Sequence, residues 1–249
     1  MAEIIVSNPD LRYVDYFYSD KTFWHGFDEF YEKYFKDRTF DNIAEIGSGA
    51  GASVKWLLNR FPNSNIYGAD LNGTWPDLGV DRYKFTHLDQ GNVEQLKGFL
   101  NQAEYNLFIE DGSHHPVHQV LCLLEGIKVI APKGIYILED IHTSLAGVAN
   151  GHGGNALSVL MGIQHYRRLN ITIDSDVAQK LTNNSLMTID DVLLLDHHID
   201  TIEIFKRTRL PDWCAVCKST EFNYSQFKCV CGVGIFDWFD SMTIVIVKK

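Results

Sequence analysis

The stretch that decides the fold is Ile43-Ala44-Glu45-Ile46-Gly47-Ser48-Gly49-Ala50-Gly51-Ala52. Its apolar start predicts a buried β-strand, and residues 52–60 predict a helix directly after it. Glycines between a strand and a helix allow a tight turn and let a ligand approach the free N–H groups at the helix start. Gly47, Gly49 and Ala52 also satisfy the spacing of a dinucleotide-binding turn. The stretch therefore predicts the first βα unit of an open sheet, with a ligand at its turn.

Strand and helix patterns alternate beyond this unit. Strand patterns follow at 65–69, 83–87, 105–110 and 134–138, and helical patterns lie at 93–102 and 116–130. Alternation at this spacing is typical of βαβ units and a parallel sheet. Two late β-branched runs, 201–205 and 243–247, have no crossover helix between them, so we expect them to pair antiparallel. The predicted fold is a Rossmann-like, doubly wound α/β sheet of seven strands, mostly parallel, with an antiparallel C-terminal pair.

Composition and charge narrow the functional classes. The chain has 249 residues and a formal net charge of −10, which argues against the basic surface that sequence-independent nucleic-acid binding needs. No apolar run approaches the roughly 20 residues that span a bilayer. Residues 1–6 lack the basic region and long apolar core of a signal peptide. We therefore expect a cytoplasmic protein with neither a nucleic-acid nor a membrane partner.

The N-terminal part is rich in aromatic residues. The spacing of Phe23, Phe27, Phe30, Tyr31 and Tyr34 predicts an amphipathic helix packed on another element. We expect residues 1–38 to form an N-terminal aromatic helical cap and residues 39–249 to form the α/β domain. A cysteine-bearing insertion at about 211–233 lies within that domain.

Two strand patterns end in acidic residues: Leu107-Phe108-Ile109-Glu110-Asp111 and Ile137-Leu138-Glu139-Asp140. An unpaired buried charge is costly, so acids at the end of an apolar strand indicate a ligand. Because ligands in open α/β sheets lie outside the carboxyl ends of the strands, the two acidic ends should meet. Asp111, Glu139 and Asp140 would then suit Mg²⁺, which prefers oxygen ligands.

His114 follows Asp111 by three residues and should reach a molecule bound at that ion. The ordinary pKa of imidazole lies near neutrality, which suits a general base. The alternative is structural: Glu110 and Asp111 cap the helix that follows Pro116, or the acids pair with nearby lysines. Glu110 itself is not expected to bind the metal.

A resemblance to a known family is carried by Glu45-Ile46-Gly47-Ser48-Gly49-Ala50-Gly51. This run resembles the first motif of class I S-adenosylmethionine-dependent methyltransferases, and the order of elements over most of 40–210 and 240–249 is typical of them. The resemblance implies that the methionine end of the cofactor is held by Glu45, Gly47, Gly49 and Gly51. It also implies that Asp70 holds the ribose hydroxyls and that Asp89 and Gln90 lie by the adenine.

The acidic pattern resembles a narrower group. Asp111, His114 and the pair Glu139-Asp140 are similar to the metal-dependent sugar O-methyltransferases of macrolide and aminocoumarin biosynthesis. That resemblance implies Mg²⁺ on the three acids, His114 as the base, a sugar or glycoside hydroxyl as acceptor, and a homo-oligomer. Ser19-Asp20-Lys21 also looks like that group, although Phe27 stands where a tyrosine is expected.

Two other functions remain open. A nicotinamide-dependent oxidoreductase would use the same glycine turn but leaves the acidic strand ends unexplained. A non-catalytic binding protein could keep the fold and use the cysteine segment for contacts, but a decayed enzyme should lose Asp111 or His114.

Four of the five cysteines lie close together near the C-terminus, as Cys214, Cys217, Cys229 and Cys231. Four thiolates on two tight turns suit a tetrahedral zinc ion, and a structural disulfide is not expected in a reducing cytoplasm. The second turn is Cys-x-Cys, tighter than the usual Cys-x-x-Cys, so free or redox-active thiols and coincidental spacing stay open. Cys122, in an apolar helical stretch, is expected in the core.

Overall fold

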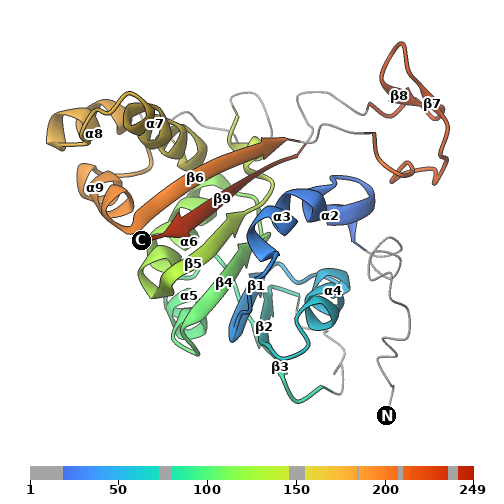
Figure 1. Ribbon diagram of the computed structural model, residues 1–249, viewed down its shortest axis with the longest axis horizontal. Helices are drawn as coiled ribbons and strands as arrows, with labels where there is room; N and C mark the ends of the chain where they lie inside the picture. The colour runs from blue at the N-terminus through green and yellow to red at the C-terminus, as the bar shows by residue number, and fades with distance from the viewer. Residues whose placement is uncertain (1–18, 73–79, 146–154, 184, 207–209, 235–240) are drawn as a thin grey trace.

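The structure is a computed structural model that describes residues 19–72, 80–145, 155–183, 185–206, 210–234 and 241–249 (Figure 1). Within these ranges the main sheet has seven strands in the order β3-β2-β1-β4-β5-β9-β6. Its strands are β1 (Asn42–Ile46), β2 (Asn65–Asp70), β3 (Tyr83–His87), β4 (Tyr105–Glu110), β5 (Ile130–Leu138), β6 (Ile199–Lys206) and β9 (Met242–Lys248). The predicted doubly wound α/β sheet is confirmed.

The strand directions follow from the connections. Strands β3, β2, β1, β4 and β5 are parallel, and β9 is antiparallel to both β5 and β6. The predicted antiparallel C-terminal pair is therefore confirmed, with β9 inside the sheet and β6 at its edge. The strand order reverses between β1 and β4, where open α/β sheets bind their ligands.

Helices cover both faces of the sheet (Figure 1). They are α2 (Asp20–Phe23), α3 (Phe27–Phe35), α4 (Ala52–Arg60), α5 (Val93–Leu100), α6 (Pro116–Val129), α7 (Ala156–Arg168), α8 (Ser175–Leu181) and α9 (Ile189–His198), with the 3₁₀ turn η1 (Ile141–Ser144). Successive strand residues point to opposite faces, so Phe108 packs with α5 and α6 while Leu107 and Ile109 pack with α3 and α4. Each face therefore has its own hydrophobic core.

The aromatic N-terminal helix packs directly on one of these faces. Phe27, Tyr31 and Phe35 of α3 are almost fully buried in a cluster with Trp56 of α4 and Val245 of β9. The amphipathic helix predicted from the aromatic spacing is confirmed from Phe27 on, whereas Phe23 ends the separate helix α2 because Gly26 adopts a left-handed conformation between them. Its packing brings residues 19–35 over the sheet, next to the carboxyl ends of the central strands (Figure 1).

A small ribbon lies apart from the main sheet. Strands β7 (Phe222–Asn223) and β8 (Lys228–Cys229) pair antiparallel in the segment that leaves β6 and returns as β9 (Figure 1). This ribbon is part of the cysteine-bearing insertion expected from the sequence. Within the described ranges, no helix combines the length and apolar character needed to cross a bilayer.

Candidate active site

The glycine turn lies against the end of β4. Gly47, Gly49 and Gly51 have φ angles of 87°, 48° and 76°, which side chains rarely adopt. A Cβ at Gly47 would stand 1.9 Å from the carbonyl oxygen of Asp111. Only glycine therefore lets the turn approach the acidic end of β4, and this contact joins the two motifs that the sequence singled out.

A cavity of about 400 Å³ opens beside this turn. Five of the seven residues predicted to bind the cofactor line it, namely Gly47, Gly49, Asp70, Asp89 and Gln90. Gly51 instead lines a neighbouring hollow together with Lys21, and Glu45 is fully buried beneath the turn. The cavity thus lies along the carboxyl ends of β1, β2 and β4, as the topology requires.

Side chains in the cavity already have partners in the protein. Asp70 accepts hydrogen bonds from the backbone N–H groups of Gly49 (2.8 Å) and Asn72 (2.9 Å). A carboxylate accepts about four hydrogen bonds, so Asp70 keeps acceptor capacity for a ligand. Gln90 is nearly buried, donates to Glu110 and accepts from the N–H of Ser113. Gln90 therefore fixes the loop after β4.

The ends of β4 and β5 bring three titratable side chains together. Asp111, His114 and Asp140 each offer one ligand atom, and these atoms lie within 4.8 Å of one another. Nε2 of His114 lies 3.4 Å from Oδ2 of Asp140 and 4.0 Å from Oδ1 of Asp111. We call these three residues the cation centre. It combines two carboxylates and an imidazole, a group of ligands that could hold a metal ion.

Two residues of the cation centre have a left-handed backbone. His114 has φ 53° and Asp140 has φ 50°, although neither is glycine. Such conformations are uncommon and persist where the surrounding structure enforces them. Here Thr143 Oγ1 donates to the carbonyl oxygens of both residues, and Ser241 Oγ donates to Asp140. The strain and its supports indicate that these side chains are held in place for a function.

The capping alternative fails for α6. His115 is the N-cap residue of that helix, and no side-chain hydrogen bond caps it. Glu110 instead lies fully buried and accepts a hydrogen bond from Gln90. Asp111 does pair with a lysine, but that lysine is Lys21, ninety residues away in sequence.

Glu139 lies further inside the protein than the cation centre. Its carboxylate accepts hydrogen bonds from Lys21 Nζ (2.8 Å) and Tyr31 Oη (2.7 Å), and all three side chains are buried. Lys21 also donates to Asp111 and lies 3.7 Å from Glu45. The structure thus joins Glu139 to Asp111 through an ammonium group. The assignment of Glu139 as a metal ligand stays a prediction.

Charge and burial shift the pKa values of these groups. Burial alone would lower the pKa of Lys21, but the carboxylates of Asp111, Glu139 and Glu45 hold it well above its ordinary value, so Lys21 is charged. Burial raises the pKa of Glu45 to about 7 against the opposing charge of Lys21. Burial also tends to raise the pKa of Asp140, but His114 and neighbouring histidines outweigh it and lower that pKa. Asp140 is therefore anionic at neutral pH.

Sequence reasoning gave no role to two residues that hold the site. Lys21 belongs to the run Ser19-Asp20-Lys21, and the aromatic spacing predicts only helix packing for Tyr31. Both reach Glu139 from the N-terminal helices. A lysine within a short polar run before an aromatic helix was the available signal, but the sequence did not indicate its partners.

Comparison with solved structures decides the type of fold. The MycE methyltransferase of the mycinamycin pathway, solved with Mg, SAH and mycinamycin VI, gives a TM-score of 0.63 over 98% of this chain, at 20% identity. The chain has the class I methyltransferase fold. A second MycE structure, with Mg and SAH, gives a TM-score of 0.60 over 80% of the chain, at 24% identity.

Curated relatives of this methyltransferase-fold chain act on sugars. The 8-demethyl-8-(2-methoxy-alpha-L-rhamnosyl)-tetracenomycin-C 3'-O-methyltransferase of Streptomyces olivaceus is 29% identical over 147 residues, 53% of the chain. The mycinamicin VI 2''-O-methyltransferase of Micromonospora griseorubida is 27% identical over 170 residues, 59% of the chain. The matches cover 36% and 39% of those enzymes, and the chain spans 55% of the MycE chain, so these relatives are longer. No protein-family model matches the chain.

Proposed function

We propose that this protein is an S-adenosylmethionine- and Mg²⁺-dependent O-methyltransferase whose acceptor is a hydroxyl group of a sugar or glycosylated small molecule. One observation carries the proposal: the cation centre of Asp111, His114 and Asp140 lies at the same sheet edge as the glycine-turn cavity, and Asp111 belongs to both. The sugar O-methyltransferases among its relatives support the acceptor class.

The cavity fits an adenosine-containing cofactor. The left-handed glycines Gly47, Gly49 and Gly51 leave the turn without side chains, which suits close approach of the methionine end. Asp70 keeps acceptor capacity for ribose hydroxyls, and the exposed Leu71 lines the cavity as an apolar contact for the adenine ring. Asp89 and Gln90 border that end. S-adenosylmethionine, when bound, supplies an electrophilic methyl group.

The cation centre fits a hard divalent ion. Asp111 and Asp140 offer carboxylate oxygens, the ligands that Mg²⁺ prefers, and both lie partly exposed. A bound Mg²⁺ polarises an acceptor hydroxyl and lowers its pKa. Glu139 would join the two aspartates only if the ammonium group of Lys21, 2.8 Å from its carboxylate, moved away, because that positive charge repels a divalent cation.

His114 is the proposed general base. Its Nε2 faces Asp140 and Asp111, so a hydroxyl held at these carboxylates would lie next to the imidazole. Nε2 would accept the hydroxyl proton as the oxygen forms its bond to the methyl carbon and the methyl–sulfur bond of S-adenosylmethionine breaks, with S-adenosylhomocysteine as the leaving group. The neighbouring anionic Asp140 stabilises the imidazolium that forms. Thr143 holds the backbone of His114 in its left-handed conformation at this position.

The test combines binding and turnover. Purified protein is screened for thermal stabilisation by S-adenosylhomocysteine and by NAD(H), and for transfer of labelled methyl to rhamnosyl glycosides and mycinamicin VI with Mg²⁺ or EDTA. We expect stabilisation by S-adenosylhomocysteine, its loss in Asp70→Ala, and transfer that EDTA abolishes. Stabilisation by NAD(H) alone would overturn the cofactor assignment, and transfer unaffected by EDTA would overturn the metal assignment.

A further inference from the structure

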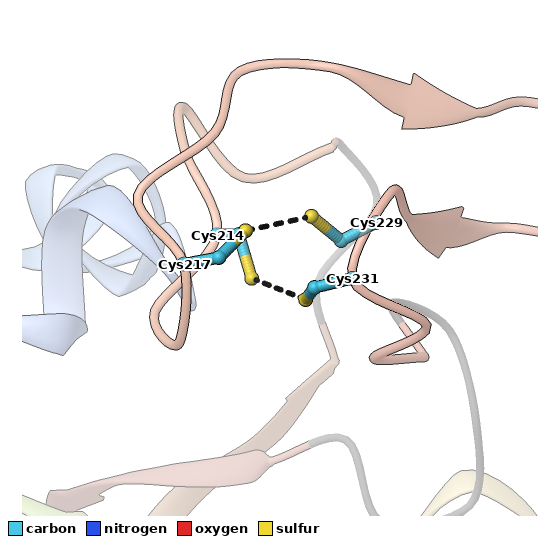
Figure 2. A group of neighbouring side chains, drawn as sticks. All are labelled: Cys214, Cys217, Cys229 and Cys231. Atoms are coloured by element: carbon cyan, nitrogen blue, oxygen red, sulfur yellow. Dashed lines mark hydrogen bonds between the residues drawn. The ribbon is translucent and has the colours of Figure 1, made fainter.

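The four cysteines of the insertion converge on one point. Cys214 and Cys217 lie on one turn, Cys229 ends strand β8 with Cys231 in the turn that follows, and the four side chains point toward one another (Figure 2). Their four sulfur atoms lie within 4.8 Å of one another. Residues fifteen positions apart in sequence therefore meet without any contribution from the main sheet.

The distances between the sulfur atoms match a metal site and not disulfides. Cys214 Sγ lies 3.6 Å from Cys231 Sγ, and Cys217 Sγ lies 3.3 Å from Cys229 Sγ. A disulfide needs about 2.05 Å. Zinc–sulfur bonds of about 2.3 Å at tetrahedral angles place the sulfurs about 3.8 Å apart. The observed spacing is close to the edge of such a tetrahedron.

The backbone of both turns is shaped around the sulfur atoms. The backbone N–H groups of Val216 and Cys217 lie near the sulfur of Cys214, and the backbone N–H of Cys231 lies near the sulfur of Cys229. Each turn ends in a left-handed residue directly after its second cysteine: Lys218 has φ 61° and Gly232 has φ 93°. Backbone N–H groups around thiolates disperse their negative charge. The two turns are therefore built alike, although one is Cys-x-x-Cys and the other Cys-x-Cys.

The insertion lacks a hydrophobic core to hold this arrangement. Its larger apolar side chains are mostly in solvent: Val216, Tyr224, Phe227 and Val230 are 52–69% exposed. The cysteines Cys214 and Cys229, by contrast, are 0% and 2% exposed. A segment this small needs a disulfide, a metal or burial against another part to stay folded. In this segment two cysteines of the sulfur cluster are buried, whereas Cys217 and Cys231 are exposed.

We propose that Cys214, Cys217, Cys229 and Cys231 bind one structural zinc ion that holds the insertion folded. Four protein ligands complete the tetrahedral shell and leave no open position for a substrate, so the ion is structural and not catalytic. The site is separate from the cation centre and does not depend on the proposed methyl transfer. Because no preformed core exists in the insertion, zinc binding there is coupled to its folding.

The zinc site also has a connection to the cation centre. After the insertion, Ser241 directly precedes β9, and its hydroxyl donates to Asp140. Before the insertion, the charge of Lys206 at the end of β6 acts on His142 beside the same aspartate. Lys206 and Ser241, which flank the insertion in sequence, therefore both act on groups at the cation centre. Loss of zinc should loosen this edge while the glycine-turn cavity stays intact.

The test measures metal content in the intact protein. We expect elemental analysis of protein purified without added metal to give one zinc per chain, and cobalt substitution to give the visible bands of tetrahedral thiolate coordination. Cys217→Ser and Cys231→Ser should each lose the zinc and make the insertion sensitive to limited proteolysis. Both variants should still bind S-adenosylhomocysteine with wild-type affinity if the proposed function holds.

Two controls separate ligand loss from general damage. Cys122→Ala changes a cysteine buried in the main core and should keep one zinc, even where the fold is less stable. Lys218→Gly relieves the left-handed position beside Cys217 and should also keep one zinc. Metal-free protein that carries two disulfides or four free thiols in this segment would overturn the proposal. Full zinc occupancy in Cys217→Ser would overturn it as well.

Discussion

Replacing Lys21 with methionine tests the electrostatics of the site directly. Lys21 is 3% exposed, and its ammonium group lies 2.8 Å from Glu139, 3.7 Å from Glu45 and in contact with Asp111. Methionine keeps the length of the side chain but leaves these buried carboxylates without their cation. Breaking a buried ion pair by removing one partner costs about 3–5 kcal/mol. We expect Lys21→Met to lower the free energy of unfolding by about that amount.

The assay is urea denaturation at neutral pH without divalent metal, followed by tryptophan fluorescence. The matched control is Lys33→Met, which removes a lysine paired with Glu203 at the surface, where both side chains are more than two-fifths exposed. Exposed pairs of this kind contribute about 0–1 kcal/mol. The double variant Lys21→Met/Glu139→Gln should recover part of the loss, because it also removes one unpaired charge.

Mg²⁺ supplies a second arm of this experiment. If Asp111 and its neighbours bind a divalent ion, Mg²⁺ should take the place of the missing ammonium charge. Saturation at about 100 times the dissociation constant stabilises a folded protein by about 2.7 kcal/mol. Lys21→Met should therefore gain more from Mg²⁺ than the wild type gains. Equal free energies of unfolding for Lys21→Met and Lys33→Met would refute the reasoning. The same holds if Lys21→Met/Glu139→Gln is as unstable as Lys21→Met alone.

Three further predictions concern the cation centre, the core and the glycine turn. His114→Asn should reduce turnover about 10²–10⁴-fold. Its free energy of unfolding should not change, because asparagine tolerates a left-handed φ. Near-normal turnover in this variant would contradict the assignment of His114 as the base. Burial raises the pKa of Glu110 from 4.5 to about 8, so its stabilising effect is complete below pH 4.5 and declines as pH rises through about 8. Urea denaturation across this pH range should show a smaller decline in the free energy of unfolding for Glu110→Gln than for the wild type. An equal decline in both proteins would contradict this role of Glu110. Gly47→Ala should abolish S-adenosylhomocysteine binding or folding, because its Cβ would meet the Asp111 carbonyl. A Cβ at Gly49 would meet no atom within 4 Å, so Gly49→Ala should lower the free energy of unfolding by only about 1 kcal/mol. A larger loss in Gly49→Ala than in Gly47→Ala would be inconsistent with this geometry.

Local sequence patterns were sufficient to predict most of the sheet. Strand β3 has the predicted bounds, 83–87, because aromatic and polar residues alternate there with the period of a strand. Strand β5 begins at Ile130, four residues before the predicted start. Pro132 and Gly134 interrupt its strand pattern, and its register with β4 shifts at the same place. Such irregular pairing depends on the neighbouring strand and is not visible in the run itself.

The candidate site was predictable only in part. Asp111, His114 and Asp140 could be grouped because the ends of parallel strands meet at one sheet edge, a consequence of topology alone. The contact of Lys21 with Glu139 spans 118 positions and depends on how the N-terminal helices dock on the sheet. No periodicity encodes that docking. Helices α8 and α9 were likewise not predicted, because short helices in a polar region give weak patterns.

The position of β9 inside the sheet has a consequence for folding during synthesis. Among the described strands, β6 pairs only with β9, and β9 follows every other strand of the sheet in sequence. As the chain leaves the ribosome, β6 has no strand to pair with until the whole cysteine-bearing segment and β9 have emerged. An exposed strand edge is a site of aggregation. Early zinc capture would draw the ends of that segment together, shorten the loop that β9 must close, and so hasten completion of the sheet.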